Sequence, residues 1–453
     1  MKNRALMTAL LCSCAAMAGA QQTGGLQATL DVSQSLDWND NPDLDAGDSD
    51  GELTARTGLT FGLSSVTQRD RLRLSLGVNF EAGDRDPLDD NTGITDPVLG
   101  LFYDRTARNA TFDFGLTYRE SEVSDSVIQD DLTNQDLIID NGTRTDTRLN
   151  FGVDLGLQSP VGLNLSGFVR NREFSDTNDP DLFDVDDRGL EAEARFRIDP
   201  RIIATLGVNW RDFDADGEET DRLTTGIDAG LQLAVTRRLD VGLSLGRDRV
   251  EIDEFIGGSP SRRVESGTSL GISADLDVPN GSVGADLQSD IGENGRRSTF
   301  RLSRSMSLPG GDLSFSAGVV DSESQDLAPL FGVNYSHELP RGSLSLALRQ
   351  DPGTSTDSEE VVNTRFSVNY SETINSVSSW NAGLSVRDVN FLNDTLSEDS
   401  RRVDLNASYR RDLTRDWDIV SGVRYSRVVS DGEADRSSNS LFLSIERRFS
   451  FRP

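Results

Sequence analysis

Three evenly spaced carboxylates form the run in this sequence that looks most like a metal site. They lie in Asp212-Phe213-Asp214-Ala215-Asp216-Gly217. Alternate carboxylates can converge on a hard cation, and a following glycine permits the turn that brings them together. The twelfth position of such a loop is Leu223 rather than glutamate. The run therefore predicts either a calcium site at Asp212, Asp214 and Asp216 or an ordinary acidic loop.

The sequence contains few residues that could form a conventional catalytic site. General acid–base and nucleophilic sites usually need a histidine that titrates near neutral pH, or a cysteine thiolate. The only histidine is His337, which follows Tyr335 in an alternating apolar pattern, and the only cysteines are Cys12 and Cys14 near the N-terminus. We expect that the protein is not an enzyme and interpret His337 as an interfacial ring.

The elements that must position these residues are β-strands. After Gly25, apolar and polar residues alternate almost everywhere, and no segment has a comparable helical period. The alternation predicts about 22 segments, plus or minus two, roughly as long as the ~9–11 residues of a tilted membrane strand. Examples are 26–38, 72–82, 239–249 and 267–278.

Composition favours a membrane barrel over a soluble protein. Only 35% of the 453 residues are hydrophobic, which is low for a chain that must bury a large core. No apolar run after the N-terminal segment approaches the ~18 residues of a transmembrane helix. A barrel needs only every second strand residue to be apolar. We therefore expect an all-β, transmembrane, antiparallel up-and-down β-barrel. A soluble all-β protein or a β-solenoid is the alternative.

The connections between segments alternate in length, as in membrane barrels. Tight turns such as Asp199-Pro200 and Pro279-Asn280-Gly281 follow even-numbered segments, whereas long aspartate-rich stretches such as 39–52 and 119–146 follow odd-numbered ones. The short turns are expected on the periplasmic side, together with both termini, and the acidic loops outside.

Tryptophan and tyrosine fall near segment ends in the apolar register, as in the two aromatic girdles of a membrane protein. The predicted girdle residues are Trp38, Tyr118, Trp210, Tyr335, Tyr370, Trp380, Tyr409, Trp417 and Tyr425.

The first twenty residues have the pattern of a secretory signal peptide. A basic start at Lys2 and Arg4 precedes a short apolar stretch and the small residues Ala18-Gly19-Ala20. We expect residues 1–20 to be a signal peptide and 21–453 the barrel; a lipoprotein signal with a lipidated Cys14 is the alternative. Without Lys2 and Arg4 the net charge of −31 becomes −33, which argues against nucleic acid as a partner.

If apolar residues face lipid, the alternate charged residues face the lumen. Such charges can set the ion preference of a channel, or they can pair with one another across strands. The predicted lumen-facing charges are Arg73, Glu81, Asp113, Arg148, Asp154, Asp228, Asp240, Asp275, Arg301, Arg304, Arg365, Asp404, Arg410, Arg424 and Glu446.

The longest loop, 119–146, contains the apolar clusters Val127-Ile128 and Leu137-Ile138-Ile139. A loop with this much apolar surface favours packing into the lumen, where its acids would form a constriction that prefers cations. The alternative is an external hairpin that extends two strands. The predicted constriction residues are Asp130, Asp131, Asp136 and Asp140.

The last segment, 441–451, resembles the C-terminal strand by which bacterial outer-membrane proteins are recognised for insertion. It alternates up to Phe449 and Phe451, although Arg447 interrupts the apolar series and Arg452-Pro453 follow the final aromatic residue. In layout the chain is similar to porin-like barrels without a plug domain, of the β-barrel porin type and of the type associated with exopolysaccharide export. Plug-bearing siderophore receptors share the strand count only, because a globular domain precedes their first strand.

The resemblance implies an integral protein of the Gram-negative outer membrane, inserted by the barrel assembly machinery and in contact with lipid and lipopolysaccharide. The expected function is transport of small hydrophilic solutes or ions through a porin-like channel that prefers cations. No cofactor is expected, apart from calcium in the acidic extracellular loops. The alternatives are a barrel for exopolysaccharide export or display, which would need periplasmic partners, and a structural or adhesive barrel with a closed lumen.

Overall fold

A computed structural model describes the protein at residues 25–42, 44, 46–47, 51–83, 92–123, 142–177, 182–216, 221–256, 259–323, 325–354, 360–391, 399–430, 432 and 434–451. The predicted signal peptide lies outside these residues. Regular structure in the described part consists of twenty-two β-strands. Within the same residues, no helix is long and apolar enough to cross a membrane.

The strands are β1 (Gly25–Asn39), β2 (Glu52–Val66), β3 (Asp70–Gly83), β4 (Thr92–Thr106), β5 (Ala110–Glu122), β6 (Thr143–Leu155), β7 (Val161–Ser175), β8 (Val185–Asp199), β9 (Ile202–Ala215), β10 (Asp221–Ala234), β11 (Leu239–Ile256), β12 (Ser259–Val278), β13 (Gly281–Gly292), β14 (Gly295–Leu308), β15 (Gly311–Ser322), β16 (Gln325–Leu339), β17 (Gly342–Thr354), β18 (Glu360–Asn375), β19 (Ser378–Phe391), β20 (Ser400–Asp412), β21 (Trp417–Ser430) and β22 (Arg436–Phe451).

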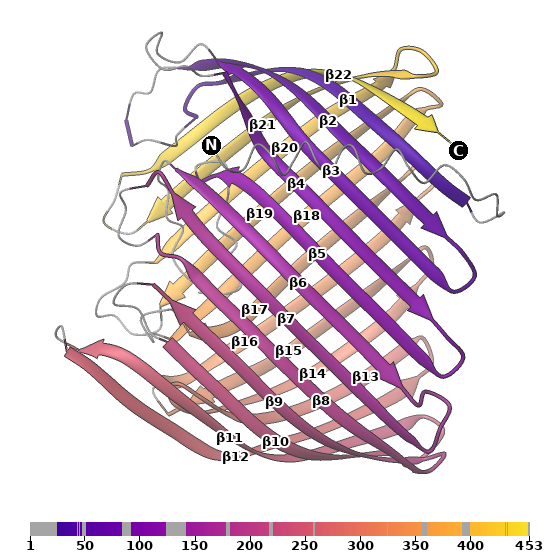
Figure 1. The fold of residues 1–453 in the computed structure, drawn as a ribbon, viewed down its shortest axis with the longest axis vertical. Helices are drawn as coiled ribbons and strands as arrows, with labels where there is room; N and C mark the ends of the chain where they lie inside the picture. Colours follow the sequence, from indigo (N-terminus) through magenta and orange to yellow (C-terminus); the bar gives the residue numbers. More distant parts are fainter. Residues whose placement is uncertain are drawn as a thin grey trace, which may run out of the picture.

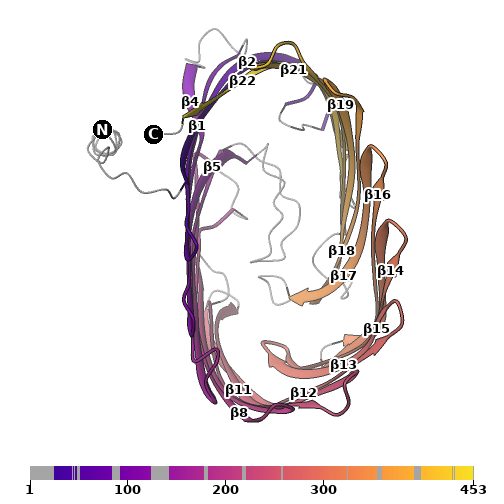
Figure 2. The same ribbon diagram turned by 90° about the vertical axis from the view of Figure 1, so that its right-hand side faces the viewer.

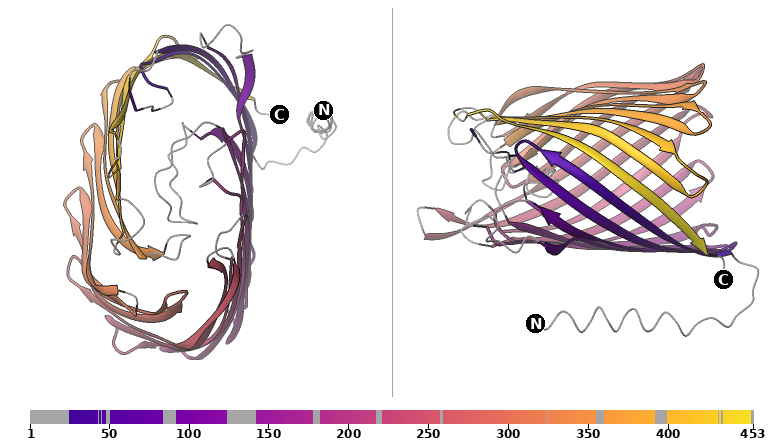
Figure 3. Two further views of the ribbon diagram at one scale, coloured as in Figure 1. Left: turned by 90° about the vertical axis from the view of Figure 1, so that its left-hand side faces the viewer. Right: turned by 90° about the horizontal axis from the view of Figure 1, so that it is seen from above.

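The strands form one closed antiparallel barrel. Each strand pairs with the next along the chain, and β22 pairs with β1 through partners such as Asp31 and Arg448. Closure leaves no sheet edge, so every strand has hydrogen-bonding neighbours on both sides, as a lipid environment requires. The tilted strands surround a lumen with an elongated oval outline (Figures 1 and 2). The end of β22 lies with the short turns (Figure 3).

The predicted number and type of elements are confirmed, and every predicted segment overlaps one strand. The main difference is that many strands run further at the end with the long connections. Segments 239–249 and 267–278 become β11 and β12, and this hairpin projects beyond its neighbours (Figure 1). Apolar and polar residues alternate only in the part of each strand that would face lipid. The backbone hydrogen bonds between strands continue beyond that part, so the strands are longer than the predicted segments.

The loop predicted at 119–146 is shorter than expected. Its first and last four residues continue β5 and β6, with Arg119 opposite Asp146 and Glu122 opposite Thr143. The extension matches one feature of the external-hairpin alternative, since both strands lengthen. The four predicted constriction aspartates lie in 124–141, outside the described residues.

The outer face takes the place of a conventional core. Leu245, Leu302 and Phe331 are 58%, 50% and 50% exposed on it. Large apolar side chains in a continuous exposed band would be costly in water, but they are stabilised when lipid covers them. In the described part, the buried apolar residues gather instead near the ends of strands, in small clusters such as Val185, Phe213 and Ala215.

Candidate functional site

The inner wall of the barrel is the candidate site, and the pairing register decides which side chains belong to it. Successive residues of a strand point to opposite faces, and directly paired residues share a face. On β3, Leu72, Leu74 and Leu76 therefore lie outside, whereas Arg73 and Ser75 line the lumen. The same argument assigns the faces of the other strands, and the pairing partners keep the assignment where the register shifts, at Gly77/Asn79, Arg197/Asp199, Val320/Ser322 and Thr373/Asn375.

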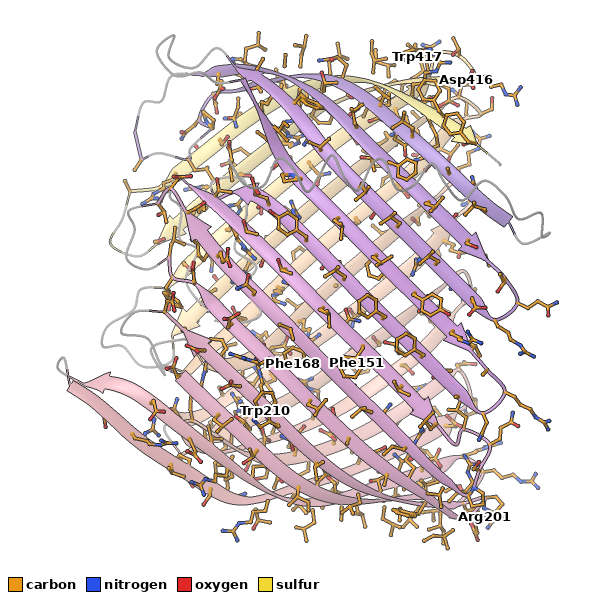
Figure 4. All side chains as sticks on the ribbon, in the orientation of Figure 1. Phe151, Phe168, Arg201, Trp210, Asp416 and Trp417 are labelled. Atoms are coloured by element: carbon orange, nitrogen blue, oxygen red, sulfur yellow. The ribbon has the colours of Figure 1, made fainter. Side chains whose placement is uncertain are left out.

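The register places all nine predicted girdle residues on the outer face. Trp210 and Trp417 are 39% and 38% exposed there and lie towards opposite ends of the barrel (Figure 4). Near the short turns, the hydroxyl of Tyr370 donates to Glu372 at 2.8 Å, and the indole Nε1 of Trp380 donates to the same carboxylate at 3.1 Å. The polar groups of Tyr370 and Trp380 thus have hydrogen-bond partners while the rings face outwards.

His337 also lies on the outer face. Its ring stacks on that of Tyr335, with centroids 6.0 Å apart and an interplanar angle of 8°. This is the interfacial position expected from the sequence. The absence of enzymatic activity stays a prediction.

Of the predicted lumen-facing charges, the register places these on the inner wall: Arg73, Glu81, Asp113, Arg148, Asp154, Asp228, Asp240, Asp275, Arg301, Arg365, Asp404, Arg410, Arg424 and Glu446.

Arg304 is the exception, and its predicted placement is wrong. It lies opposite Val283 and Phe315, which share the outer face with Leu302. Residues 301 and 304 are an odd number apart, so a regular strand cannot turn both towards the lumen. The guanidinium of Arg304 donates to the backbone carbonyls of Ser282 and Ser305, at 2.9 and 2.6 Å, near the short-turn end of β14.

Many wall charges pair across strands. Arg56 lies 2.8 Å from Glu81, and Arg195 lies 2.6 Å from Asp154. Near the short-turn end, Arg410 contacts both Asp418 and Glu446, at 2.9 and 2.5 Å. Such pairs leave the wall polar and hydrated while reducing its local net charge.

Four arginines on adjacent strands form a ladder that the sequence analysis missed except for Arg365. Arg349 on β17 lies opposite Arg365 on β18, which lies opposite Arg387 on β19, which lies opposite Arg402 on β20. Like charges directly opposite one another are destabilising, so the ladder favours anions around it.

Carboxylates accompany both ends of the arginine ladder. Arg349 lies 2.5 Å from Asp351, and Arg402 lies 2.9 Å from Asp404. Burial also changes along the ladder, because the side chain of Arg349 is 71% exposed whereas Arg387 is only 5% exposed. The accessible end is therefore on β17 and β18.

A second arginine pair lies on the opposite long wall of the oval. Arg148 on β6 lies directly opposite Arg170 on β7, and the guanidinium of Arg170 lies 4.9 Å from the centroid of the Phe168 ring. Figure 2 shows the wall that contains β5 facing the wall of β17 and β18 across the short dimension of the lumen.

Two cavities along the inner wall differ in charge. The larger, about 790 Å³, lies against β1–β5 and β20–β22, and its lining carries four arginines and two aspartates: Arg56, Arg119, Arg402, Arg424, Asp96 and Asp404. The smaller, about 500 Å³, lies against β8–β13; its lining carries carboxylates and no arginine within the described residues. Those carboxylates are Glu193, Asp228, Asp248, Asp286 and Asp290.

At the end with the long connections, several inward-facing positions are apolar and buried, among buried polar residues such as Arg172 and Asn363. Ile252, Val361 and Val389 are 0% exposed, and Leu330 is 1% exposed. We call these four residues the apolar rim. The pairing register turns all four towards the inside of the barrel.

An ion pair lies close to Ile252 of this rim. Arg222 at the start of β10 lies 2.9 Å from Glu293, in the turn between β13 and β14, and 4.2 Å from the centroid of the Phe213 ring. Burial raises the pKa of Glu293, and the positive charge of Arg222 opposes that shift.

The residues of the predicted calcium site lie along a strand end. Asp212 and Asp214 belong to β9, where alternate side chains share the outer face, and Asp212 lies 3.5 Å from Arg188. Asp216 directly follows the strand, while residues 217–220 lie outside the described part. Among the described residues, no three histidine, cysteine, aspartate or glutamate side chains are grouped closely enough to hold a metal ion.

No family model and no curated protein matches this chain. Solved structures share its fold. The ferric enterobactin receptor PfeA from Pseudomonas aeruginosa has a TM-score of 0.57 at 10% identity, covering 95% of this chain and 82% of its own. The FrpB iron transporter from Neisseria meningitidis has 0.55 at 9%, covering 95% and 83%. The copper transporter OprC has 0.52 at 13%, covering 95% and 81%.

These similarities show that the chain has the fold of a large closed barrel, which it shares with outer-membrane receptors and transporters. The likeness to receptors extends over nearly the whole chain, further than the shared strand count expected from the sequence. These neighbours are receptors and transporters for iron and copper rather than general porins. The absence of a plug domain therefore stays a prediction.

Proposed function

We propose that this protein is an outer-membrane channel, without a plug domain, that admits small hydrophilic solutes or ions. The observation that carries the proposal is the contrast between the two faces of one closed sheet. The outer face is apolar and exposed, whereas the inner wall is polar, carries many charges and borders two cavities. A polar wall inside a lipid-facing barrel is the arrangement that hydrated solutes need.

The proposal keeps the preference for cations. In the described residues, its support is the smaller cavity, whose carboxylates attract cations along one end of the oval. The positive charges of the arginine ladder oppose this preference near the end with the long connections. The acids of 130–140, on which the preference first rested, lie outside the described residues.

Planar-bilayer recordings of the refolded protein test both statements. Stable conductance steps are expected, with a reversal potential in a salt gradient that has the sign of cation selectivity. A silent bilayer from correctly folded protein would overturn the channel. Conductance with anion selectivity would overturn only the cation preference.

One observation favours the alternative of exopolysaccharide export. The accessible end of the arginine ladder holds Arg349 and Arg365 on paired strands about 4.8 Å apart, so these two guanidinium groups can bind neighbouring carboxylates of an extended anionic chain. Block of the conductance by an anionic oligosaccharide, but not by a neutral one of equal length, would favour export. Equal effects of the two would favour a general channel.

The apolar rim favours the other alternative, a barrel whose lumen is closed. Ile252, Leu330, Val361 and Val389 are packed on the inside at the level where solutes would enter. A channel of this kind needs either a path beside the rim or movement of it. Polar substitutions such as Val361→Ser and Val389→Ser should raise the open probability if the rim closes the path.

A further inference from the structure

Positive and negative charges are separated between the two ends of the barrel. The turns that follow even-numbered strands contain seven arginines, which we call the arginine collar, and a single acid, Asp416. The opposite connections contain one arginine, Arg85, and many aspartates and glutamates. The collar consists of Arg69, Arg108, Arg201, Arg237, Arg238, Arg341 and Arg415. In a chain of net charge −31, this concentration of positive charge at one end requires an explanation.

The collar arginines are exposed and have few partners inside the protein. All seven are exposed side chains. Arg341 donates to the carbonyl of Ile374 at 3.2 Å. The guanidinium groups of the other six make no hydrogen bond or ion pair within the described part of the chain. Their charge is therefore available to an external anion.

The collar lies at the level of the membrane interface. Arg415 is two residues from Trp417, whose ring faces outwards and lies 5.2 Å from the guanidinium of Arg447. Tyrosine and tryptophan rings at a strand end mark the headgroup region of a bilayer. Arg201 and Asp416 are seen at this end in Figure 4. The collar therefore lies where lipid phosphates would be.

The arrangement around the barrel favours lipid over a protein partner. The collar arginines come from six turns, starting with β2–β3 and β4–β5 and ending with β20–β21, so they surround much of the short-turn end of the barrel. A docked acidic protein would cover only one patch of this circumference. Lipid headgroups surround the whole circumference.

We propose that the arginine collar binds the phosphate groups of anionic glycerophospholipids in the leaflet around the short-turn end. The planar guanidinium fork matches phosphate oxygens in a bidentate manner, and each interaction is strengthened beside a negatively charged surface. Binding on all sides would fix the height of the barrel in the membrane. The acidic opposite end would be repelled from phosphates unless divalent cations intervene.

Electron spin resonance of spin-labelled lipids tests this proposal. The folded protein is placed in phosphatidylcholine vesicles, and the fraction of motionally restricted label is compared for phosphatidylglycerol and phosphatidylcholine. The expected result is a preference of about threefold for phosphatidylglycerol, which decreases in high salt because exposed charges are screened. This readout does not depend on conductance, so it is separate from the test of the channel.

Two matched variants locate the preference. The collar variant is Arg69→Gln, Arg108→Gln, Arg237→Gln, Arg238→Gln and Arg415→Gln. The control removes equal charge from the lumen: Arg73→Gln, Arg148→Gln, Arg170→Gln, Arg301→Gln and Arg349→Gln. The preference should disappear in the collar variant and persist in the control. Where either fails to fold, the pairs R237Q/R238Q and R148Q/R170Q replace them, with a smaller loss expected only in the first.

Equal restriction of both lipids by the unmodified protein would overturn the proposal, and would point to an acidic protein as the partner. A preference that the collar and lumen variants reduce equally would also overturn it, since the effect would then be one of net charge.

Discussion

Arg222 and Glu293 form an ion pair of 2.9 Å although 71 residues separate them in the sequence. The pair joins the start of β10 to the turn between β13 and β14, so it crosses the inner side of β11 and β12. Only 17% of the Arg222 side chain and 4% of the Glu293 side chain are exposed. The contact therefore connects the β13–β14 hairpin to β10 on the inside of the barrel.

Removing the arginine should loosen this hairpin. Arg222→Ala removes the ion-pair partner of a buried carboxyl group, which should cost the local structure about 3 kcal/mol. Hydrogen exchange of the β13–β14 amides is expected to become faster, with little change in β1–β4. The control is Arg262→Ala, which removes an exposed outer-face partner of Glu251. Equal acceleration by both substitutions would contradict a specific role for Arg222.

The raised pKa of Glu293 predicts a pH dependence of the same hairpin. A carboxyl group whose pKa is higher in the folded state favours folding most when it is protonated in both states. Its contribution is therefore fully present below the ordinary value of 4.5 and is lost as the pH rises through the folded-state pKa. Exchange protection of the β13–β14 amides should be greater under acid conditions. Glu293→Gln should remove this dependence, and an unchanged pH profile would show that another group causes it.

The arginine ladder should affect ion selectivity. Arg365→Gln combined with Arg387→Gln removes two neighbouring positive charges from the inner wall. A charge interaction of about 1 kcal/mol corresponds to roughly a fivefold change in ion occupancy, so the cation-to-anion permeability ratio should rise by about that factor. Reversal potentials in a salt gradient measure it. Arg304→Gln on the outer face is the control and should leave the ratio unchanged.

The turn between β12 and β13 should tolerate no side chain at Gly281. This residue has a φ of 134°, and a Cβ there would lie 2.1 Å from the carbonyl oxygen of Ser305. Gly281→Ala should lower the free energy of unfolding by about 1–3 kcal/mol. Gly93→Ala is a suitable control because a Cβ there meets nothing within 4 Å. Urea unfolding in detergent micelles compares the two, and equal midpoints would contradict the prediction.

The assignment of the two faces can be tested at adjacent residues. Leu302 lies on the outer face and is 50% exposed, whereas Ser303 faces the lumen opposite Gly284 and Ser316. Leu302→Arg should destabilise the barrel in a bilayer by about 2–4 kcal/mol, because it places a charge in lipid. Ser303→Arg should cost much less. Reversible unfolding from vesicles measures both, and the opposite order would invert the assigned faces.

Several features of the wall could be predicted from the sequence because they depend on local alternation. The spacing of Leu72, Leu74 and Leu76 identifies the outer face of β3, and with it Arg73 as a lumen residue. The same rule, applied within one strand, would have shown that Arg301 and Arg304 cannot share a face. That error came from grouping charges by type rather than by position along the strand.

The arginine ladder could not be predicted in this way. Arg349, Arg365, Arg387 and Arg402 are separated by 15 to 22 positions in the sequence, and nothing local indicates that they lie side by side. Their alignment depends on the lengths of three turns and loops and on the register of each strand pair. The ion pair of Arg222 and Glu293 is a stronger case, because two further strands, β11 and β12, lie between the elements that it joins.

The sequence by itself determined the strand type, the number of strands to within two and the division between an outward-facing apolar and an inward-facing polar set of residues, because successive residues of a strand point to opposite faces. Only the tertiary structure decided which inward-facing charges meet, which arginines align in the ladder, and which inward-facing apolar residues are buried at the end with the long connections. These relations depend on the register between strands and on the closure of β22 against β1, which bring together residues that no local pattern connects.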